Sequence, residues 1–168
     1  KGAQSGGWAA RLVLVPRHPE RFDSVSKQCA DAGFQVIRRS TNTAPTSATD
    51  IVVGDTMGEL LTFYGAADMA FVGGSLVPVG GHNLIEPAAW ACPIISGSHL
   101  FNFSEVEKLL RDNNALMIAD NAEQMAAQVS QWLHDDDLRR GFGERAKAVA
   151  DSNRGALEKL CTLITSHQ

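Results

Sequence analysis

Two glycine pairs in the middle of the chain could let a phosphate group come close to the backbone. Gly73-Gly74 and Gly80-Gly81 follow the apolar run 68–72 and precede a helix-start pattern. Glycine has no side chain, so it tolerates sharp turns and a close ligand. A glycine-rich loop that leads into a helix presents backbone N–H groups, which bind anions. We therefore expect a phosphate-bearing ligand at this loop.

The helix that follows the glycines can start in two ways. If Asn83 caps the helix, Glu86 is its third residue and Pro87 gives up one early backbone bond. If Glu86 is the cap, Pro87 takes the favoured first position. In both cases Glu86 lies in the first turn. Its carboxylate could accept the hydroxyls of a ribose, or it could only cap its own helix.

Three further side chains could contact an anion. Arg17 comes directly after an apolar run, and its guanidinium could hold a phosphate or carboxylate through two hydrogen bonds, unless it is an ordinary surface arginine. Ser75 could donate its hydroxyl to a phosphate or only satisfy the loop backbone. His18 is the weakest of the three, because it could simply shape a turn between two prolines.

The remaining polar candidates favour structural roles. Asp55 precedes a capping pattern made by Thr56 and Glu59, which explains that loop without a ligand. His82 could contact an anion or act as an acid, but a histidine where a loop meets a helix is more often structural. The acidic run 135–137 is typical of a solvated first helical turn rather than of a metal site.

Composition limits the class of protein. The 168 residues are 44% hydrophobic and 20% charged, as in ordinary globular proteins. No apolar run is long enough to cross a membrane. The net charge of −4 argues against a nucleic-acid partner bound through broad phosphate neutralisation. The three cysteines, Cys29, Cys92 and Cys161, have no metal spacing and are expected to be free thiols.

Apolar runs and helical spacing alternate along the chain. Strands are predicted at 11–15, 34–37, 50–53, 68–72, 92–95 and 115–118. Helices are predicted at 20–32, 56–64, 84–91, 104–111, from 121 onward, at 135–151 and at 153–165, with a break near Asn153. This order predicts an α/β fold with a Rossmann-like parallel sheet, helices on both faces and a helical C-terminus. Residues 1–10 resemble a linker or fragment start, and 11–168 are expected to form one domain.

The unusual loops follow the predicted strands. They are the segments 16–21, 54–56, 73–82 and 96–103. Because the carboxyl ends of parallel strands lie at one edge of a sheet, all four loops are expected at the edge where such sheets bind ligands.

Five ordered segments together resemble the C-terminal half of 3-deoxy-D-manno-octulosonic acid (Kdo) transferases of lipopolysaccharide core synthesis. They are Leu12-Val-Leu-Val-Pro-Arg-His-Pro-Glu-Arg-Phe22, Val53-Gly-Asp-Thr-Met-Gly-Glu-Leu60, Ala70-Phe-Val-Gly-Gly-Ser-Leu76, Gly80-Gly-His-Asn-Leu-Ile-Glu-Pro87 and His99-Leu-Phe-Asn-Phe103. Asn153-Arg-Gly-Ala-Leu157 is similar to the C-terminal helix of that family. The likeness runs through nearly the whole chain from Arg11 onward.

The resemblance implies the second half of a GT-B glycosyltransferase, which binds the donor CMP-Kdo without a metal or other cofactor. Pro16 and Arg17 would contact the CMP portion, and Met57 would help to hold the nucleotide. The phosphate would be cradled by Ser75, Gly80, Gly81 and Asn83, and Glu86 would take the ribose hydroxyls. The full-length enzyme would act on a lipid A precursor at the cytoplasmic face of the inner membrane, whereas the fragment alone is expected to be soluble.

Two departures from the family pattern concern completeness. The family has a strand ending in a Ser/Thr-His-Glu-Gly type of loop before the Pro16-Arg17 segment, and this chain begins without it. The N-terminal half, which would hold the acceptor, the membrane-associating surface and the catalytic carboxylate, is also absent. We expect a fragment that does not transfer sugar alone, with no catalytic residue of its own.

Two other interpretations stay open from the sequence. One is another GT-B nucleotide-sugar enzyme, such as a UDP-sugar transferase or epimerase, which competition between CMP and UDP would distinguish. The other is a non-catalytic domain that binds an anion or a partner protein, which the absence of any nucleotide binding would favour.

Overall fold

The computed structural model describes the backbone of residues 10–165 and the side chains of residues 10–152. The chain divides into two compact units, Lys1–Phe63 and Tyr64–Gln168, and each is described by itself. The expected linker at 1–10 lies almost wholly outside the described residues.

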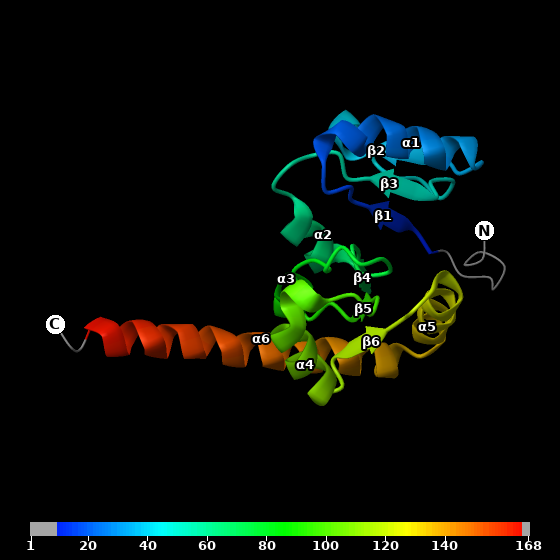
Figure 1. Cartoon of the computed structure of the whole chain (residues 1–168). Helices are drawn as coiled ribbons and strands as arrows, with labels where there is room; N and C mark the ends of the chain where they lie inside the picture. Colours follow the sequence, from blue (N-terminus) through cyan, green and yellow to red (C-terminus); the bar gives the residue numbers. More distant parts are fainter. Residues whose placement is uncertain (1–9, 166–168) are drawn as a thin grey trace. The chain divides into compact units, whose positions relative to one another are not determined.

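The first unit is a small parallel sheet with one helix on it (Figure 1). Its strands are β1 (Leu12–Leu14), β2 (Val36–Arg38) and β3 (Ile51–Val53), in the spatial order β1-β3-β2. The helix α1 (Phe22–Asp31) lies along one face and follows a short 3₁₀ turn, Pro19–Arg21. A second 3₁₀ turn, Arg39–Thr41, follows β2. The boundary with the second unit falls inside α2 (Leu60–Ala66).

Burial in the first sheet is concentrated in its middle strand. All three residues of β3 are buried, whereas Leu12 and Val13 of β1 are 52% and 41% exposed. Successive residues of a strand point to opposite faces, so β1 is exposed on both of its faces. The strand is apolar on both sides but has a neighbour on one edge alone among the described residues.

The second unit is a parallel sheet with helices on both faces. Its strands β4 (Ala70–Val72), β5 (Ile94–Ser96) and β6 (Leu116–Ile118) run in the order β4-β5-β6. The helices are α3 (Ile85–Ala89), α4 (Ser104–Asp112), α5 (Ala122–His134) and α6 (Asp136–Thr165), with a 3₁₀ turn at Phe101–Phe103.

Two adjacent residues of β5 show how both faces of this sheet are covered. Ile94 is completely buried in one cluster with side chains of α4 and α6, among them Leu110 and Val149. Ile95 points the other way and packs with Trp132 of α5. Burial on both faces explains why a central parallel strand is a continuous apolar run.

The alternating pattern predicted the strands correctly but not how they would pair. All six predicted strands are present, although β2, β4 and β5 each begin two residues later than expected. The described strands form two three-stranded sheets rather than the single sheet expected from the sequence. Alternation of strands and helices indicates parallel pairing but does not fix which strands become neighbours.

Three helix predictions need correction. The helix predicted from residue 56 begins at Leu60, and the helix predicted at 84–91 is Ile85–Ala89. The two helices predicted on either side of Asn153 are one continuous helix, α6. Asparagine lowers helix propensity by only a few tenths of a kcal/mol relative to the better helix formers, roughly 0.7 at most, so it does not by itself end a helix.

Candidate functional site

The glycine loop, which we define as residues 73–82 between β4 and α3, closes on itself. Gly74, Gly80 and Gly81 all have positive φ, at 70°, 105° and 77°. The Gly81 amide donates to the carbonyl oxygen of Gly74 at 2.8 Å and joins the two ends of the loop. Positive φ is the backbone region that favours glycine, so the sequence pattern found a special backbone as predicted.

The loop packs against the segment that follows β5. A Cβ placed on Gly81 would lie 2.4 Å from Cδ2 of Leu100, and one placed on Gly80 would lie 2.7 Å from Cε2 of Phe101. Close packing therefore requires both glycines whether or not a ligand is bound. The segments 73–82 and 96–103 follow neighbouring strands and contact each other, as expected for loops at the same edge of the sheet.

Ser75 lies in the interior of this arrangement instead of facing a ligand. The residue is completely buried, its hydroxyl donates to the Val72 oxygen at 2.7 Å, and the hydroxyl oxygen accepts the Gly97 amide at 2.8 Å. Both bonds hold the loop to the sheet. The expected donation from Ser75 to a phosphate is therefore replaced by a role in fixing the loop.

Asn83 and Glu86 contact each other at the start of α3. The Asn83 oxygen accepts the Ile85 amide at 3.0 Å, and its Nδ2 donates to Oε1 of Glu86 at 3.1 Å. Neither predicted helix start is observed, because the N-cap is Leu84, which follows Asn83, and Glu86 is the second helical residue. α3 has five residues, so a helix dipole contributes little at its start.

Tyr64 is a neighbour of Glu86 that the sequence did not single out. Burial, with smaller contributions from the nearby Glu86 and Cys92, raises the pKa of Tyr64 to about 12. The phenol therefore stays protonated near the Glu86 carboxylate over the whole physiological range. Its position became apparent only from the fold, because no sequence motif includes it.

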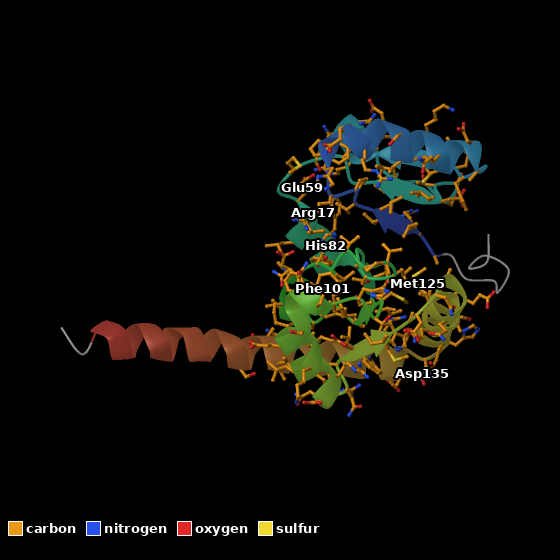
Figure 2. All side chains as sticks on the ribbon, in the orientation of Figure 1. Arg17, Glu59, His82, Phe101, Met125 and Asp135 are labelled. Carbon is orange, nitrogen blue, oxygen red and sulfur yellow. The ribbon has the colours of Figure 1, made fainter. Side chains whose placement is uncertain are left out.

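In the first unit, Pro16 and Arg17 follow β1 and Met57 follows β3. Pro16 is half-buried, Arg17 is exposed, and Met57 is 71% exposed. Figure 2 labels Arg17 and, further along the chain, Glu59. β1 and β3 are parallel neighbours, so their carboxyl-terminal loops lie at the same edge of the first sheet, as predicted.

Asp55 is a buried carboxylate of the first unit that several hydrogen bonds hold in place. Its side chain is 1% exposed and accepts hydrogen bonds from Arg38 Nε, from the Ser40 amide at 2.8 Å and from the Ser40 hydroxyl. Burial opposes ionisation, but the bonds from Ser40 and Arg38 outweigh it and lower the pKa of Asp55 to about 2. Asp55 is an anion that ties the ends of β2 and β3 together, which supports the structural interpretation made from the sequence.

The capping box predicted from Thr56 and Glu59 does not start the helix, because α2 begins at Leu60, after both residues. The Thr56 hydroxyl donates to Glu59, and Arg39 donates to the same carboxylate at 2.8 Å. The hydrogen bond from Thr56 lowers the pKa of Glu59, and Arg39 adds to this effect while partial burial opposes it. The pair closes the loop before α2 instead of forming the first turn of the helix.

The remaining polar candidates have structural surroundings. His18 lies 3.9 Å from Glu20 and is exposed. The ring of His82, labelled in Figure 2, lies against Gly74, where an added Cβ would be 3.1 Å from Nε2. Asp135 accepts the Leu138 amide at 2.8 Å at the start of α6. Asp136 and Asp137 pair with Arg139 and Arg140, so this run is the helical first turn that the sequence predicted.

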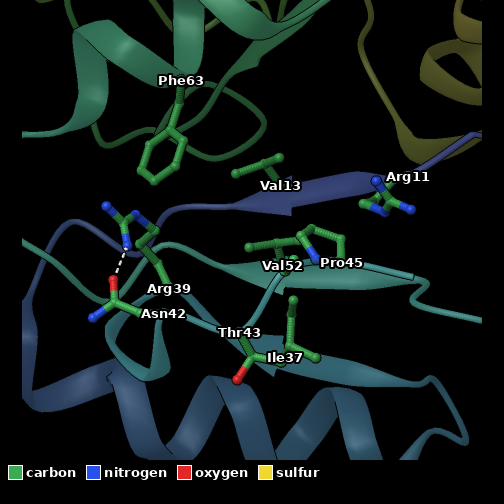
Figure 3. Close-up of a pocket in the computed structure, with 10 residues that line it drawn as sticks. Arg11, Val13, Ile37, Arg39, Asn42, Thr43, Pro45, Val52 and Phe63 are labelled. Atoms are coloured by element: carbon green, nitrogen blue, oxygen red, sulfur yellow. Dashed lines mark hydrogen bonds between the residues drawn. The ribbon is translucent and has the colours of Figure 1, made fainter.

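A cavity of about 410 Å³ lies on the first sheet, apart from the residues expected to bind a ligand (Figure 3). Val13, Val52 and Ile37 form one row across the three strands and make its floor, and Phe63 faces them. Arg39 at one end bonds to Asn42 and Glu59. The cavity is an open apolar sheet face more than a polar binding site.

Three properties of the described residues bear on the predicted class. None of their helices combines the length and hydrophobicity that a bilayer crossing requires. They contain no group of three or more metal-ligating side chains that could hold an ion. Cys29 and Cys92 are free thiols, and burial raises the pKa of Cys92 to about 12, whereas the side chain of Cys161 lies outside the described residues.

Comparison with protein families matches residues 35–149 to glycosyl transferases group 1. The match spans more than half of the chain. The chain belongs to this family.

Relatives of known sequence give a narrower likeness. The chain is 44% identical to 3-deoxy-D-manno-octulosonic acid transferase of Haemophilus influenzae, over 91% of its own length and 36% of the relative. It is 37% identical to the Bordetella pertussis protein of the same name, over 88% and 35% of the two chains. The chain therefore spans about a third of these relatives, which confirm the resemblance carried by the five motifs.

A solved structure confirms the fold. The C-terminal CMP-Kdo binding domain of WaaA from Acinetobacter baumannii matches with a TM-score of 0.79 and 35% identity, covering 83% of this chain and 72% of that one. The match supports the α/β class and the parallel strands of this group 1 glycosyltransferase.

Proposed function

We propose that this chain is the donor-binding C-terminal part of a Kdo transferase that moves Kdo from CMP-Kdo to a lipid A precursor. The observation that carries the proposal is the likeness to the WaaA CMP-Kdo binding domain, at 35% identity and TM-score 0.79. The self-closed glycine loop and the Asn83–Glu86 pair are compatible with a nucleotide site.

The side chains available for the donor differ in the chemistry that they offer. The exposed guanidinium of Arg17 can pair with the phosphate, and exposed Met57 offers an apolar contact for the base. Glu86 accepts from Asn83 through Oε1, and its second oxygen can accept a ribose hydroxyl.

Fewer backbone amides are available to donate to the phosphate than the sequence indicated. The Gly81 amide is engaged inside the loop, so the amides of Gly80 and Asn83 are the proposed phosphate donors. Pro16 completes the proposed donor contacts, and Ser75 and Gly81 serve by fixing the loop.

The proposed reaction is direct displacement at the anomeric carbon of Kdo. A carboxylate in the N-terminal part of the longer protein would remove the proton from an acceptor hydroxyl. That oxygen would form the new glycosidic bond as the bond between Kdo and the CMP phosphate breaks. Arg17 and the loop amides would stabilise the negative charge that develops on departing CMP. The chain alone would therefore bind the donor without transferring sugar, and the longer protein would act at the cytoplasmic face of the inner membrane.

Calorimetric titration of the chain with CMP, UMP and AMP tests this proposal. We expect CMP to bind selectively, and we expect Arg17→Ala and Glu86→Ala each to weaken binding about tenfold or more, because each removes a charge-assisted contact. Arg21→Ala and Glu105→Ala are matched controls in the same units and should bind CMP like the original chain.

The other outcomes are informative. Preference for UMP would indicate a different nucleotide-sugar enzyme. Absence of binding to all three nucleotides would contradict donor binding by this chain and would favour a domain that binds another anion or a partner protein.

A further inference from the structure

Asn102 makes two hydrogen bonds to the glycine loop. Its backbone amide donates to the Gly80 oxygen at 3.2 Å, and its side-chain Nδ2 donates to the Val79 oxygen at 3.4 Å. The side chain lies across Gly80, where a Cβ would come within 2.2 Å of Nδ2. No residue other than glycine fits at position 80 beside this asparagine.

These bonds orient two successive peptide groups. The group between Gly80 and Gly81 is held at both ends, because its oxygen accepts from Asn102 and its N–H donates to Gly74. The group between Val79 and Gly80 is held through its oxygen by the Asn102 side chain. A trans peptide group is planar, with its N–H pointing opposite to its oxygen. Asn102 therefore directs the Gly80 N–H away from itself.

The loop has no equivalent restraint of its own at this point. Gly80 has a φ of 105° and follows a tight turn in which the Val79 amide donates to the Val77 oxygen at 2.7 Å. Glycine populates many backbone conformations, so an unrestrained Val79–Gly80 peptide group would sample several orientations. A hydrogen bond from a neighbouring segment selects one of them before any ligand arrives.

We propose that Asn102 is a positioning residue that presents the Gly80 amide to the phosphate of the donor. The proposal rests on the proposed function of this loop. Asn102 itself does not contact the reacting atoms, since it acts through the peptide group between Val79 and Gly80. Loss of the Asn102 side chain should therefore weaken binding of the phosphate and leave binding of the nucleoside unchanged.

Titration of the 168-residue chain with CMP and with cytidine, which lacks the phosphate, tests the proposal. For Asn102→Ala we expect CMP to bind about five- to tenfold more weakly, the effect of losing one net hydrogen bond, and cytidine to bind as before. Asn113→Ala is the matched control, because Asn113 also donates through Nδ2 to a backbone oxygen, that of Leu109, at the end of α4. It should leave both affinities unchanged and lower the melting temperature as much as Asn102→Ala does.

The outcomes separate this proposal from the one on which it rests. Equal weakening of CMP and cytidine by Asn102→Ala would mean a general structural effect and would overturn the positioning role. An unchanged preference for CMP over cytidine in that variant would overturn it as well. An original chain without affinity for CMP would overturn the donor-binding function itself, and the role of Asn102 with it.

Discussion

The two three-stranded sheets contain similarly apolar strands but bury them to different degrees. In the second unit, the middle strand β5 is buried on both faces by α3, α4, α5 and α6. In the first unit, α1 lies on one face, and β1 exposes Leu12 and Val13 on opposite faces. The same α/β pattern therefore gives a complete core in one unit and a partly covered sheet in the other.

This difference shows that the apolar faces of a strand indicate surfaces that are buried in the complete protein. Apolar residues on both faces of a strand are expected where a parallel sheet is covered on both sides. The Haemophilus influenzae relative aligns with the chain over only 36% of its own length, so a protein of that length has further parts that can cover a strand such as β1.

Matched truncations should reveal the difference in burial directly. Leu110→Ala removes a completely buried side chain of the second unit and should lower the free energy of unfolding by about 2–5 kcal/mol. Leu12→Ala truncates a side chain that is 52% exposed and should cost less than about 1 kcal/mol. Hydrogen exchange of the β5 and β3 amides reports the two effects separately. Comparable losses would contradict the comparison, because Leu12 would then have to be covered in solution.

Two glycines of α6 should respond in opposite directions to the same substitution. A Cβ on Gly143 would lie 2.1 Å from the backbone oxygen of Ala91, so Gly143→Ala should destabilise the second unit by about 1–3 kcal/mol. A Cβ on Gly141 meets only the movable end of Arg145 at 3.0 Å, so Gly141→Ala should stabilise it by up to about 1 kcal/mol through helix propensity. Urea unfolding measures both, and stabilisation by Gly143→Ala would disprove the tight contact.

The first unit should depend on Asp55 in a pH-sensitive way. The pKa of Asp55 is lowered from 3.8 to about 2 in the folded protein, so the folded state binds this proton less readily than the unfolded state. The resulting stabilisation is complete above pH 3.8 and is lost as the pH falls through about 2. Asp55→Asn should therefore be less stable than the original chain at neutral pH and should lack this part of the acid dependence. Hydrogen exchange of β3 at several pH values measures it, and identical acid profiles would contradict the prediction.

An exposed ion pair of the second unit should have the smallest effect. Lys108 donates to Asp112 one helical turn away at 2.6 Å, with both side chains more than half exposed. Asp112→Asn should cost only about 0.3–0.5 kcal/mol, and added salt should remove the difference because it screens exposed charges. Urea unfolding at low and high salt measures this effect, and a loss above about 1 kcal/mol would show that the pair is more than a surface contact.

Sequence patterns predicted the elements of the fold well where those elements depend on residues close together in the chain. The apolar runs located all six strands, and the glycines of residues 73–81 indicated the special backbone of the loop. The spacing of Asn83 and Glu86 indicated a helix start, and α3 begins between them at Ile85. Each of these features depends on residues a few positions apart.

Contacts between distant parts of the chain could not be predicted in the same way. Asp55 bonds to Arg38 across 17 positions, and Asn102 bonds to Val79 across 23. The sequence contained Asn102 within a recognised motif without indicating a role for it. The inward orientation of Ser75 was likewise determined by Gly97, which lies on the next strand connection.

Among the described residues β1 has a strand neighbour on one edge alone, which bears on how the chain behaves at high concentration. An unpaired apolar strand offers its backbone N–H and C=O groups to any extended segment, including the same strand of another molecule. Nothing in Leu12-Val13-Leu14 opposes such pairing, since the strand carries neither a proline nor an inward-pointing charge. If no other segment pairs with this edge, β1 favours edge-to-edge association, and Leu12→Lys would oppose it.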